Sequence, residues 1–321
     1  MNHLPTFDDI VDARRVIGQH LTRTPLYRYA GLSELLGCNA FVKHENHQPI
    51  CVFKIRGGIN LVSRLNDDER RRGVVTASTG NHGQSIAYAS KMFGVTATIV
   101  VPEKSNPDKV SAIERMGATI VFHGKDFDEA REQAEQLAVS HGYRYIHSAN
   151  EPLLIAGVGT IGAEIVEDCP EVDVIVVPVG GGSGASGTSI AVKAMKPTAE
   201  VIGVQSELAP AAYFSWKEGK PVSSDLMKTF AEGLATRVGF SMTVEIMKRN
   251  LSDFVLVSDD DIRRAMKLIL EHTHNLVEGS GAAPLAGALK IKDRLKGKNV
   301  VMVLSGANVT ITTLREVLSF S

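Results

Sequence analysis

The sequence predicts an α/β fold with two open, twisted, mainly parallel sheets flanked by helices. Short apolar segments of strand length alternate with segments whose apolar residues recur at helical spacing. Several strand-like segments are apolar almost throughout, as strands are when helices cover both faces of a parallel sheet. At 321 residues the chain is long for one core and long enough for two domains.

The first 65 residues contain few of these elements. Apolar residues at helical spacing predict a helix over residues 6–18, and a short apolar segment predicts a strand at 40–43. An irregular loop follows at 44–49. A helix is then expected from Lys54 to about Leu65.

A compact series of strands and helices comes next and is expected to form a small inserted domain. Its strands are predicted at 73–77, 97–101 and 119–122, and its helices end at Lys91 or cover 109–116 and 126–141. We assign residues 66–149 to this small domain. Residues 1–65 and 150–321 then form the large domain.

The large domain continues with a second series. This series begins at residues 157–166. A helix is expected at 188–195, and strands at 172–179, 201–205, 254–257 and 299–304. The acidic stretch that begins at Ser258 is typical of a helix N-terminus, so a helix is expected to follow it to His274.

The composition excludes several classes of protein. Net charge is −1, with 44% hydrophobic and 22% charged residues, so no basic excess favours nucleic acid. Apolar runs are of strand length, which argues against a membrane span, and the N-terminus lacks the apolar core of a signal peptide. The three cysteines are far apart and are expected to be thiols in a reducing compartment. A cytoplasmic enzyme or binding protein is therefore expected.

Polar loops follow three predicted strands, and the one after residues 172–179 is the richest in glycine. It consists of Gly180, Gly181, Gly182, Ser183 and Gly184, and it precedes a helix. Open α/β sheets bind ligands at such strand ends, where backbone amides and a helix N-terminus favour an anion. The loop therefore predicts a phosphate site, and a tight structural turn is the alternative.

The kind of phosphate compound stays open at this point. Residues 182–187 match G-x-G-x-x-G, the dinucleotide fingerprint, and Glu207 follows the next strand, roughly where a ribose-binding acid is sought. An NAD(P)-dependent oxidoreductase is thus an alternative. A nucleoside-triphosphate loop is disfavoured, because no Gly-Lys-Ser/Thr follows the glycines.

The other two loops carry hydroxyl, amide and imidazole groups. Ser78, Thr79, Gly80, Asn81 and His82 open a helix and would suit a carboxylate, with a helix N-cap as the alternative. Ser305 begins the third loop, for which an N-cap is again the alternative. Because the C-terminal ends of parallel strands share one side, the three loops are expected to face one cleft, with Lys54 opposite.

A lysine beside a phosphate site suggests pyridoxal phosphate, which binds lysine covalently and acts as an electron sink. Here the sequence resembles the fold-type II pyridoxal-phosphate enzymes, specifically the serine/threonine dehydratase and serine racemase group. Val52-Phe53-Lys54-Ile55-Arg56-Gly57, residues 155–160 and the loops at 78–83, 180–184 and 305–308 carry this resemblance, in the family's order. It implies a tryptophan synthase β-like fold in which the large domain binds the cofactor and the small domain the substrate.

The resemblance also implies roles for single residues. Lys54 would bind the cofactor and then remove the substrate Cα proton, and residues 180–184 would bind the phosphate. Asn81 would hydrogen-bond the 3′-oxygen of the pyridine ring, and Ser305 would face the ring nitrogen. Residues 78–82 would bind the substrate carboxylate, with Thr79 as a second catalytic candidate.

Ser305 favours β-elimination over other reactions. A neutral hydroxyl supports a weaker electron sink than an aspartate would, which suits expulsion of a group from Cβ. We expect dehydration and deamination of an L-threonine- or L-serine-type 3-hydroxy amino acid to a 2-keto acid and ammonia. A serine-type amino-acid racemase is the alternative, because Thr79 keeps a hydroxyl where family racemases carry serine. A non-catalytic binding protein would need neither Lys54 nor Asn81.

Departures from the family pattern bear on substrate and metal. Ile50, Cys51 and Val52 replace Thr-Gly-Ser or similar, so a larger or more apolar substrate is an alternative. Gln205 and Ala211 stand at acidic positions of the cation site of racemase-type members, so no tight metal site is expected. Arg131 is expected to be a solvated helix residue. The family usually forms dimers, so a homodimer is expected.

Overall fold

The computed structural model describes residues 3–320 and contains two open sheets flanked by helices, which confirms the predicted fold class. The larger sheet has six strands in the order β1-β2-β10-β7-β8-β9, and only the edge strand β1 is antiparallel to its neighbour. Its strands are β1 (Leu26–Arg28), β2 (Asn39–His44), β7 (Val174–Pro178), β8 (Glu200–Ser206), β9 (Asp253–Val257) and β10 (Asn299–Leu304).

Central strand β7 is apolar throughout because it is buried on both faces. Val174 and Val176 pack with α12 (Asp259–Thr273) and α13 (Gly279–Lys290), whereas Ile175 and Val177 pack with α8 (Pro152–Asp168) and α9 (Ser183–Met195). Alternate side chains of a strand point to opposite faces, so four consecutive residues of β7 serve both helix layers. Helix α12 begins as predicted, with a capping box between Ser258 and Asp261.

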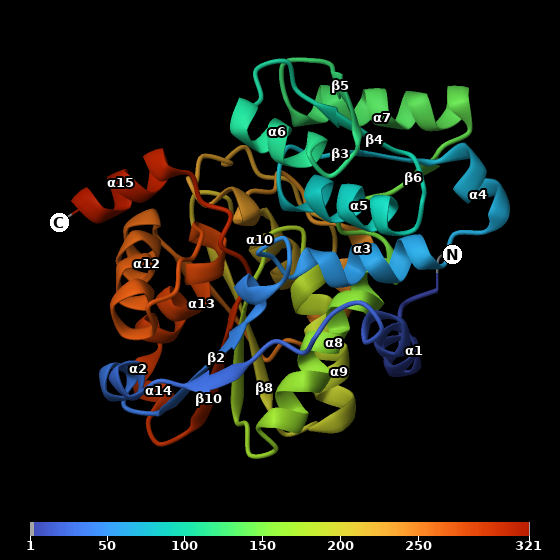
Figure 1. Cartoon of the computed structure of the whole chain (residues 1–321). Helices are drawn as coiled ribbons and strands as arrows, with labels where there is room; N and C mark the ends of the chain where they lie inside the picture. Colours follow the sequence, from blue (N-terminus) through green and yellow to red (C-terminus); the bar gives the residue numbers. More distant parts are fainter. Residues whose placement is uncertain (1–2, 321) are drawn as a thin grey trace.

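The smaller sheet has four parallel strands in the order β5-β4-β3-β6. They are β3 (Val74–Ala77), β4 (Ala97–Val101), β5 (Thr119–Phe122) and β6 (Arg144–Tyr145). Helices α5 (Asn81–Met92) and α6 (Pro107–Glu114) cover one face, and α7 (Phe127–His141) covers the other, as Figure 1 shows. All four strands lie within residues 66–149, whose exact boundaries stay a prediction.

The remaining elements of residues 3–320 are all helices. Helix α4 (Asp67–Arg72) has no apolar spacing that would predict it, because all six of its residues are charged, but a capping box between Asn66 and Glu69 stabilises its first turn. No helix of residues 3–320 combines the length and the apolar character that crossing a bilayer requires. The other elements are α1 (Phe7–Ile17), α2 (Ala30–Leu36), η1 (Glu45–His47), α3 (Lys54–Ser63), α4 (Asp67–Arg72), α10 (Ala211–Glu218), η2 (Glu232–Leu234), α11 (Ser241–Asn250), α14 (Lys292–Leu295) and α15 (Ile311–Ser319).

Two ion pairs join the helices of the smaller sheet to the segment between α10 and α11. Lys109 of α6 pairs with Glu232, and Asp128 of α7 pairs with Arg237 at 3.4 Å. Glu232, Asp128 and Arg237 are exposed to solvent. The two sheet regions therefore meet at their rim through charged side chains.

Candidate active site

Lys54 is the first residue of α3, and the backbone before it is bound to the loop that follows β10. The N–H of Phe53 donates to the carbonyl oxygen of Ser305 at 3.0 Å, and Val52 forms an antiparallel bridge with Gly306. Residues separated by about 250 positions in the sequence are thus neighbours. The structure brings Lys54 and the Ser305 loop together, as the sequence predicts.

The glycine loop lies on the other side of Phe53. A Cβ placed on Gly184 would lie 3.1 Å from the Phe53 ring, and one on Gly180 would lie 2.1 Å from the carbonyl oxygen of Gly233. Gly182 has φ +92° and caps α9 without any side-chain hydrogen bond. The loop can therefore accept an anion on backbone N–H groups of the first helical turn but cannot accept side chains. This donor set fits a phosphate group.

The amine of Lys54 lies among protein atoms, although the residue as a whole keeps some accessible surface. Its Nζ donates to the carbonyl oxygen of Ser148 at 3.4 Å and lies 5.4 Å from the centre of the Phe53 ring. Burial lowers the pKa of Lys54 from 10.5 to about 8, and the nearby Glu278 carboxylate partly opposes this. A substantial share of the amine is therefore neutral near neutral pH, as a nucleophile or a base requires.

The loop after β3 opens α5, which packs against α3. Ser78, Thr79, Gly80 and Asn81 are half-buried, and the hydroxyl of Ser85 donates to the carbonyl oxygen of Lys54 at 2.6 Å. His82 is buried, and its Nε2 lies 3.0 Å from the hydroxyl of Thr76 inside the smaller sheet. Burial lowers the pKa of His82 well below its usual value, so its imidazole is neutral.

Asn81 is bound to two residues that carried no role in the sequence prediction. Its Nδ2 donates to both carboxylate oxygens of Glu278, at 2.9 and 3.1 Å, and its Oδ1 accepts from Asn308 Nδ2 at 2.8 Å. The N–H of Asn308 also donates to Glu278, at 3.1 Å. An amide nitrogen carries two N–H groups, and both bonds that Asn81 Nδ2 makes go to Glu278, so donation to a ligand would replace one of them. Burial raises the pKa of Glu278, while these donors act in the opposite direction.

Glu278 could not have been found from a strand-end pattern. It precedes α13 rather than following a strand, and its contact with Asn81 spans 197 positions. The only local signal is a carboxylate between apolar Val277 and the small residues of α13, which is unusual for a buried segment.

Two side chains weighed for other roles have structural partners. Gln205 is fully buried, and its amide accepts from the N–H of Tyr213 at 3.0 Å and donates to the carbonyl oxygen of Leu234 at 3.3 Å. Arg131 is partly exposed and pairs with Glu135 at 2.8 Å along α7.

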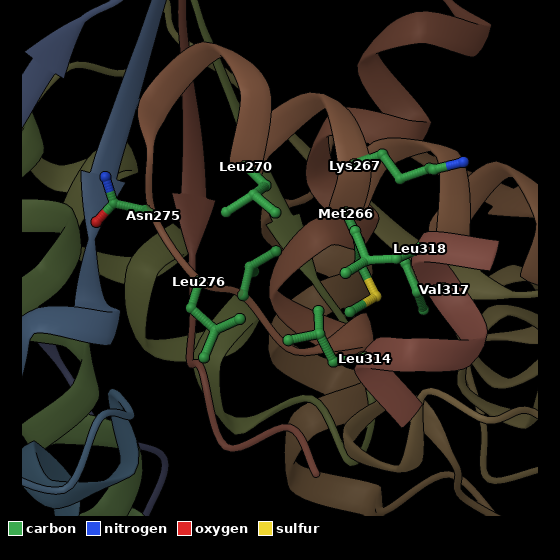
Figure 2. Close-up of a pocket in the computed structure, with 9 residues that line it drawn as sticks. Met266, Lys267, Leu270, Asn275, Leu276, Leu314, Val317 and Leu318 are labelled. Atoms are coloured by element: carbon green, nitrogen blue, oxygen red, sulfur yellow. The ribbon is translucent and has the colours of Figure 1, made fainter. Parts of the chain in front are cut away.

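A separate small pocket lies between α12 and α15 (Figure 2). Met266, Leu270, Leu314 and Val317 line it, and its cavity volume is about 10 Å³, the space of about one water molecule. None of the site residues predicted from sequence lines it, and it is too small for an organic cofactor.

Comparison with known proteins agrees with this geometry. The family described as "Pyridoxal-phosphate dependent enzyme" matches residues 17–306. An L-threonine ammonia-lyase of Thermotoga maritima is 39% identical over 98% of this chain and 78% of its own length. Threonine deaminase isoform 2 of Solanum lycopersicum superimposes with a TM-score of 0.94 at 33% identity, covering 99% of this chain and 97% of that one. Serine racemase of Dictyostelium discoideum does so with 0.90 at 36% identity, covering 96% and 99%.

Proposed function

The chain belongs to the family of pyridoxal-phosphate-dependent enzymes, and on this premise we propose that it is an L-threonine ammonia-lyase. Such an enzyme converts L-threonine to a 2-keto acid and ammonia. The observation that carries the proposal is the position of Lys54, because the residue before it, Phe53, contacts both the glycine loop and the Ser305 loop while the Lys54 amine donates to the carbonyl oxygen of Ser148. The likeness to threonine ammonia-lyases and deaminases over nearly the whole chain supports the choice of substrate.

Lys54, Asn81, Ser305 and the loop at 180–184 would hold the cofactor. Its phosphate would bind the backbone N–H groups at the start of α9, and Ser305 and Asn81 would hold its ring by hydrogen bonds. Bound pyridoxal phosphate supplies an electron sink for the electron pair of the substrate Cα–H bond. Glycine is required at Gly180 and Gly181 because a Cβ there would meet neighbouring protein atoms within 3 Å, so only glycine lets the loop take this conformation.

The chain's own groups would handle the substrate and the protons. The Lys54 amine takes the Cα proton, for which a pKa of about 8 suits neutral pH. Residues 78–82 orient the substrate carboxylate with backbone and side-chain donors at the start of α5. Glu278 and Asn308 fix the amide of Asn81 by three hydrogen bonds, so its orientation is set before a ligand arrives.

A racemase is the second candidate, and Thr79 is the observation that favours it. Its side chain is half-buried in the loop after β3, and it carries a hydroxyl. A serine racemase is also among the similar structures. A β-branched side chain restricts the orientation of that hydroxyl, so we place elimination first.

The test combines a spectrum with product analysis. Lysine-bound pyridoxal phosphate absorbs at about 410–420 nm, and Lys54→Ala should abolish this band. The protein should release 2-keto acid from L-threonine faster than it inverts L-serine. Inversion without release of keto acid would favour the racemase. We also propose that the protein is cytoplasmic and forms a homodimer, as the family usually does. Light scattering of the purified protein should give the mass of two chains.

A further inference from the structure

A short turn connects β6 of the smaller sheet to α8 of the larger one, and its geometry depends on one imidazole. His147 Nδ1 accepts the backbone N–H of Ala149 at 3.0 Å and that of Asn150 at 2.9 Å. A backbone N–H can only donate, so Nδ1 must be unprotonated. The imidazole thus does what an Asn or Asp side chain does in an Asx turn.

The turn that His147 closes contacts the candidate active site at two points. The carbonyl oxygen of Ser148 accepts from the Lys54 amine at 3.4 Å. The Cβ of Ala149 lies 2.8 Å from where a Cβ on Gly181 would be, so Ala149 packs directly on the glycine loop. One turn therefore contacts both the reactive amine and the phosphate cradle.

The far end of the turn is attached to α11. Asn150 Oδ1 accepts the N–H of Met242 at 3.0 Å, and the His147 ring meets the Phe240 ring edge-on with centres 4.6 Å apart. Phe240 also lies close to Gly181. Held at both ends, the turn has little freedom as long as Nδ1 accepts its two N–H groups.

We propose that His147 is a positioning residue, whose unprotonated Nδ1 folds residues 147–150 so that Ser148 holds the Lys54 amine and Ala149 supports the phosphate loop. The inference rests on the proposed role of Lys54. His147 acts through the turn and does not itself touch the substrate.

The surroundings of His147 keep it neutral. The charged and titratable groups that face it are Lys54 of α3, His82 of α5, and Arg131 and Glu135 of α7. Burial, followed by the charge of Arg131, lowers the pKa of His147 from 6.5 to about 4, and Glu135 acts in the opposite direction. Nδ1 is therefore free to accept at the pH at which the enzyme would work.

Two substitutions separate the acceptor from the bulk of the ring. His147→Leu removes the acceptor, whereas His147→Asn keeps an oxygen that can accept the N–H groups two and three residues on. Phe240→Leu is the matched control, because it removes the ring contact and leaves the acceptor in place. Amide exchange of Ala149 and Asn150 is measured in protein without cofactor, so this readout does not depend on the proposed reaction.

In His147→Leu we expect exchange of both amides to rise at least about tenfold and the Kd for pyridoxal phosphate to rise about tenfold. At saturating cofactor the kcat for L-threonine should fall while KM stays within about twofold, because the turn contacts Lys54 and the phosphate loop and does not include residues 78–82, which would bind the substrate. His147→Asn should restore each value to within about threefold, and Phe240→Leu should leave the exchange unchanged.

The proposal is overturned if His147→Leu exchanges like the unaltered protein, or if Asn is as damaging as Leu. Nitrogen chemical shifts of His147 in the unaltered protein give an independent reading that needs no variant to fold. A proton on Nε2 agrees with the proposal, and a proton on Nδ1 contradicts it. If His147→Leu shows the expected rise in amide exchange but the unaltered protein does not react with L-threonine, the proposed function is rejected and the inference about the turn stands.

Discussion

The depressed pKa of Lys54 should govern how fast protein without cofactor reacts with pyridoxal phosphate. Only a neutral amine attacks the aldehyde. With a pKa of about 8, roughly one-quarter of the Lys54 amines are neutral at pH 7.5, against about 0.1% for a lysine at its ordinary 10.5. The structure thus supplies roughly 240-fold more reactive amine than an exposed lysine has.

Stopped-flow absorbance measures this directly. The growth of the band at about 410–420 nm is followed from about pH 6 to 10 and divided by the rate of Nα-acetyl-lysine under the same conditions, which cancels the ionisation of the reagent itself. The ratio should be greatest at low pH and should fall once the pH exceeds about 8, and the protein rate alone should rise with a midpoint near pH 8. Lys54→Arg is the control without a band.

Glu278→Gln sharpens the experiment. The Glu278 carboxylate favours the protonated amine, so its removal should shift the midpoint below that of the unaltered protein. A midpoint above about pH 9.5 in the unaltered protein would refute the claim that burial controls this amine. An upward shift in the variant would refute the assigned effect of Glu278.

Three further substitutions test the fold and the cradle. Arg56→Met removes the only cation paired with buried Glu45 among the described residues and one of the two paired with Glu164, so it should lower the free energy of unfolding by about 3–5 kcal/mol in urea titration. Exposed Arg71→Met should change it by less than about 0.5 kcal/mol. A small loss for Arg56→Met would contradict this reasoning. Cys51→Gly should raise the free energy of unfolding by about 0.5–1 kcal/mol in the same assay, because Cys51 has φ +56°, a conformation that strains a residue with a side chain. A lower free energy of unfolding in this variant would count against backbone strain at residue 51. Gly180→Ala should weaken the binding of pyridoxal phosphate at least about tenfold in a fluorescence titration. Gly18→Ala, at a position with φ −62°, should leave the affinity unchanged. Equal affinities in the two variants would argue against the glycine loop as the phosphate site.

The parts of the site that sequence predicts are those with a local pattern. Residues 180–184, 78–82 and 305 each follow a buried strand, and the rule that parallel strands end on one side places their loops near each other. The same argument predicts a shared cleft with Lys54 opposite the loops, and the family resemblance then implies a catalytic role for it. The same local reasoning predicts the cap at Ser258.

The parts that sequence misses depend on contacts between distant segments. Glu278 becomes informative only when Asn81 and Asn308 are seen to bind it, and His147 only when its Nδ1 is seen to accept the turn that follows it. Arg56 belongs to the recognised motif, yet its buried partners Glu45 and Glu164 lie 11 and 108 positions away. A single sequence does not say which charged residues pair in the core.

The departure at residues 50–52 has a structural explanation only in part. Cys51 stands in a left-handed conformation that favours glycine, which is the residue the family has at the matching position. Ile50 and Val52 are buried in the hydrophobic core, and Val52 packs against Gly306. Their effect on the choice of substrate stays a prediction.

The ion pairs at the rim hold the two sheet regions together only weakly at that edge. Exposed pairs such as Asp128 with Arg237 contribute about 0–1 kcal/mol each, and salt weakens them further. Thermal motion at ordinary temperature supplies enough energy to part pairs of this strength. The cohesion of the two sheet regions at this edge therefore depends on ionic strength.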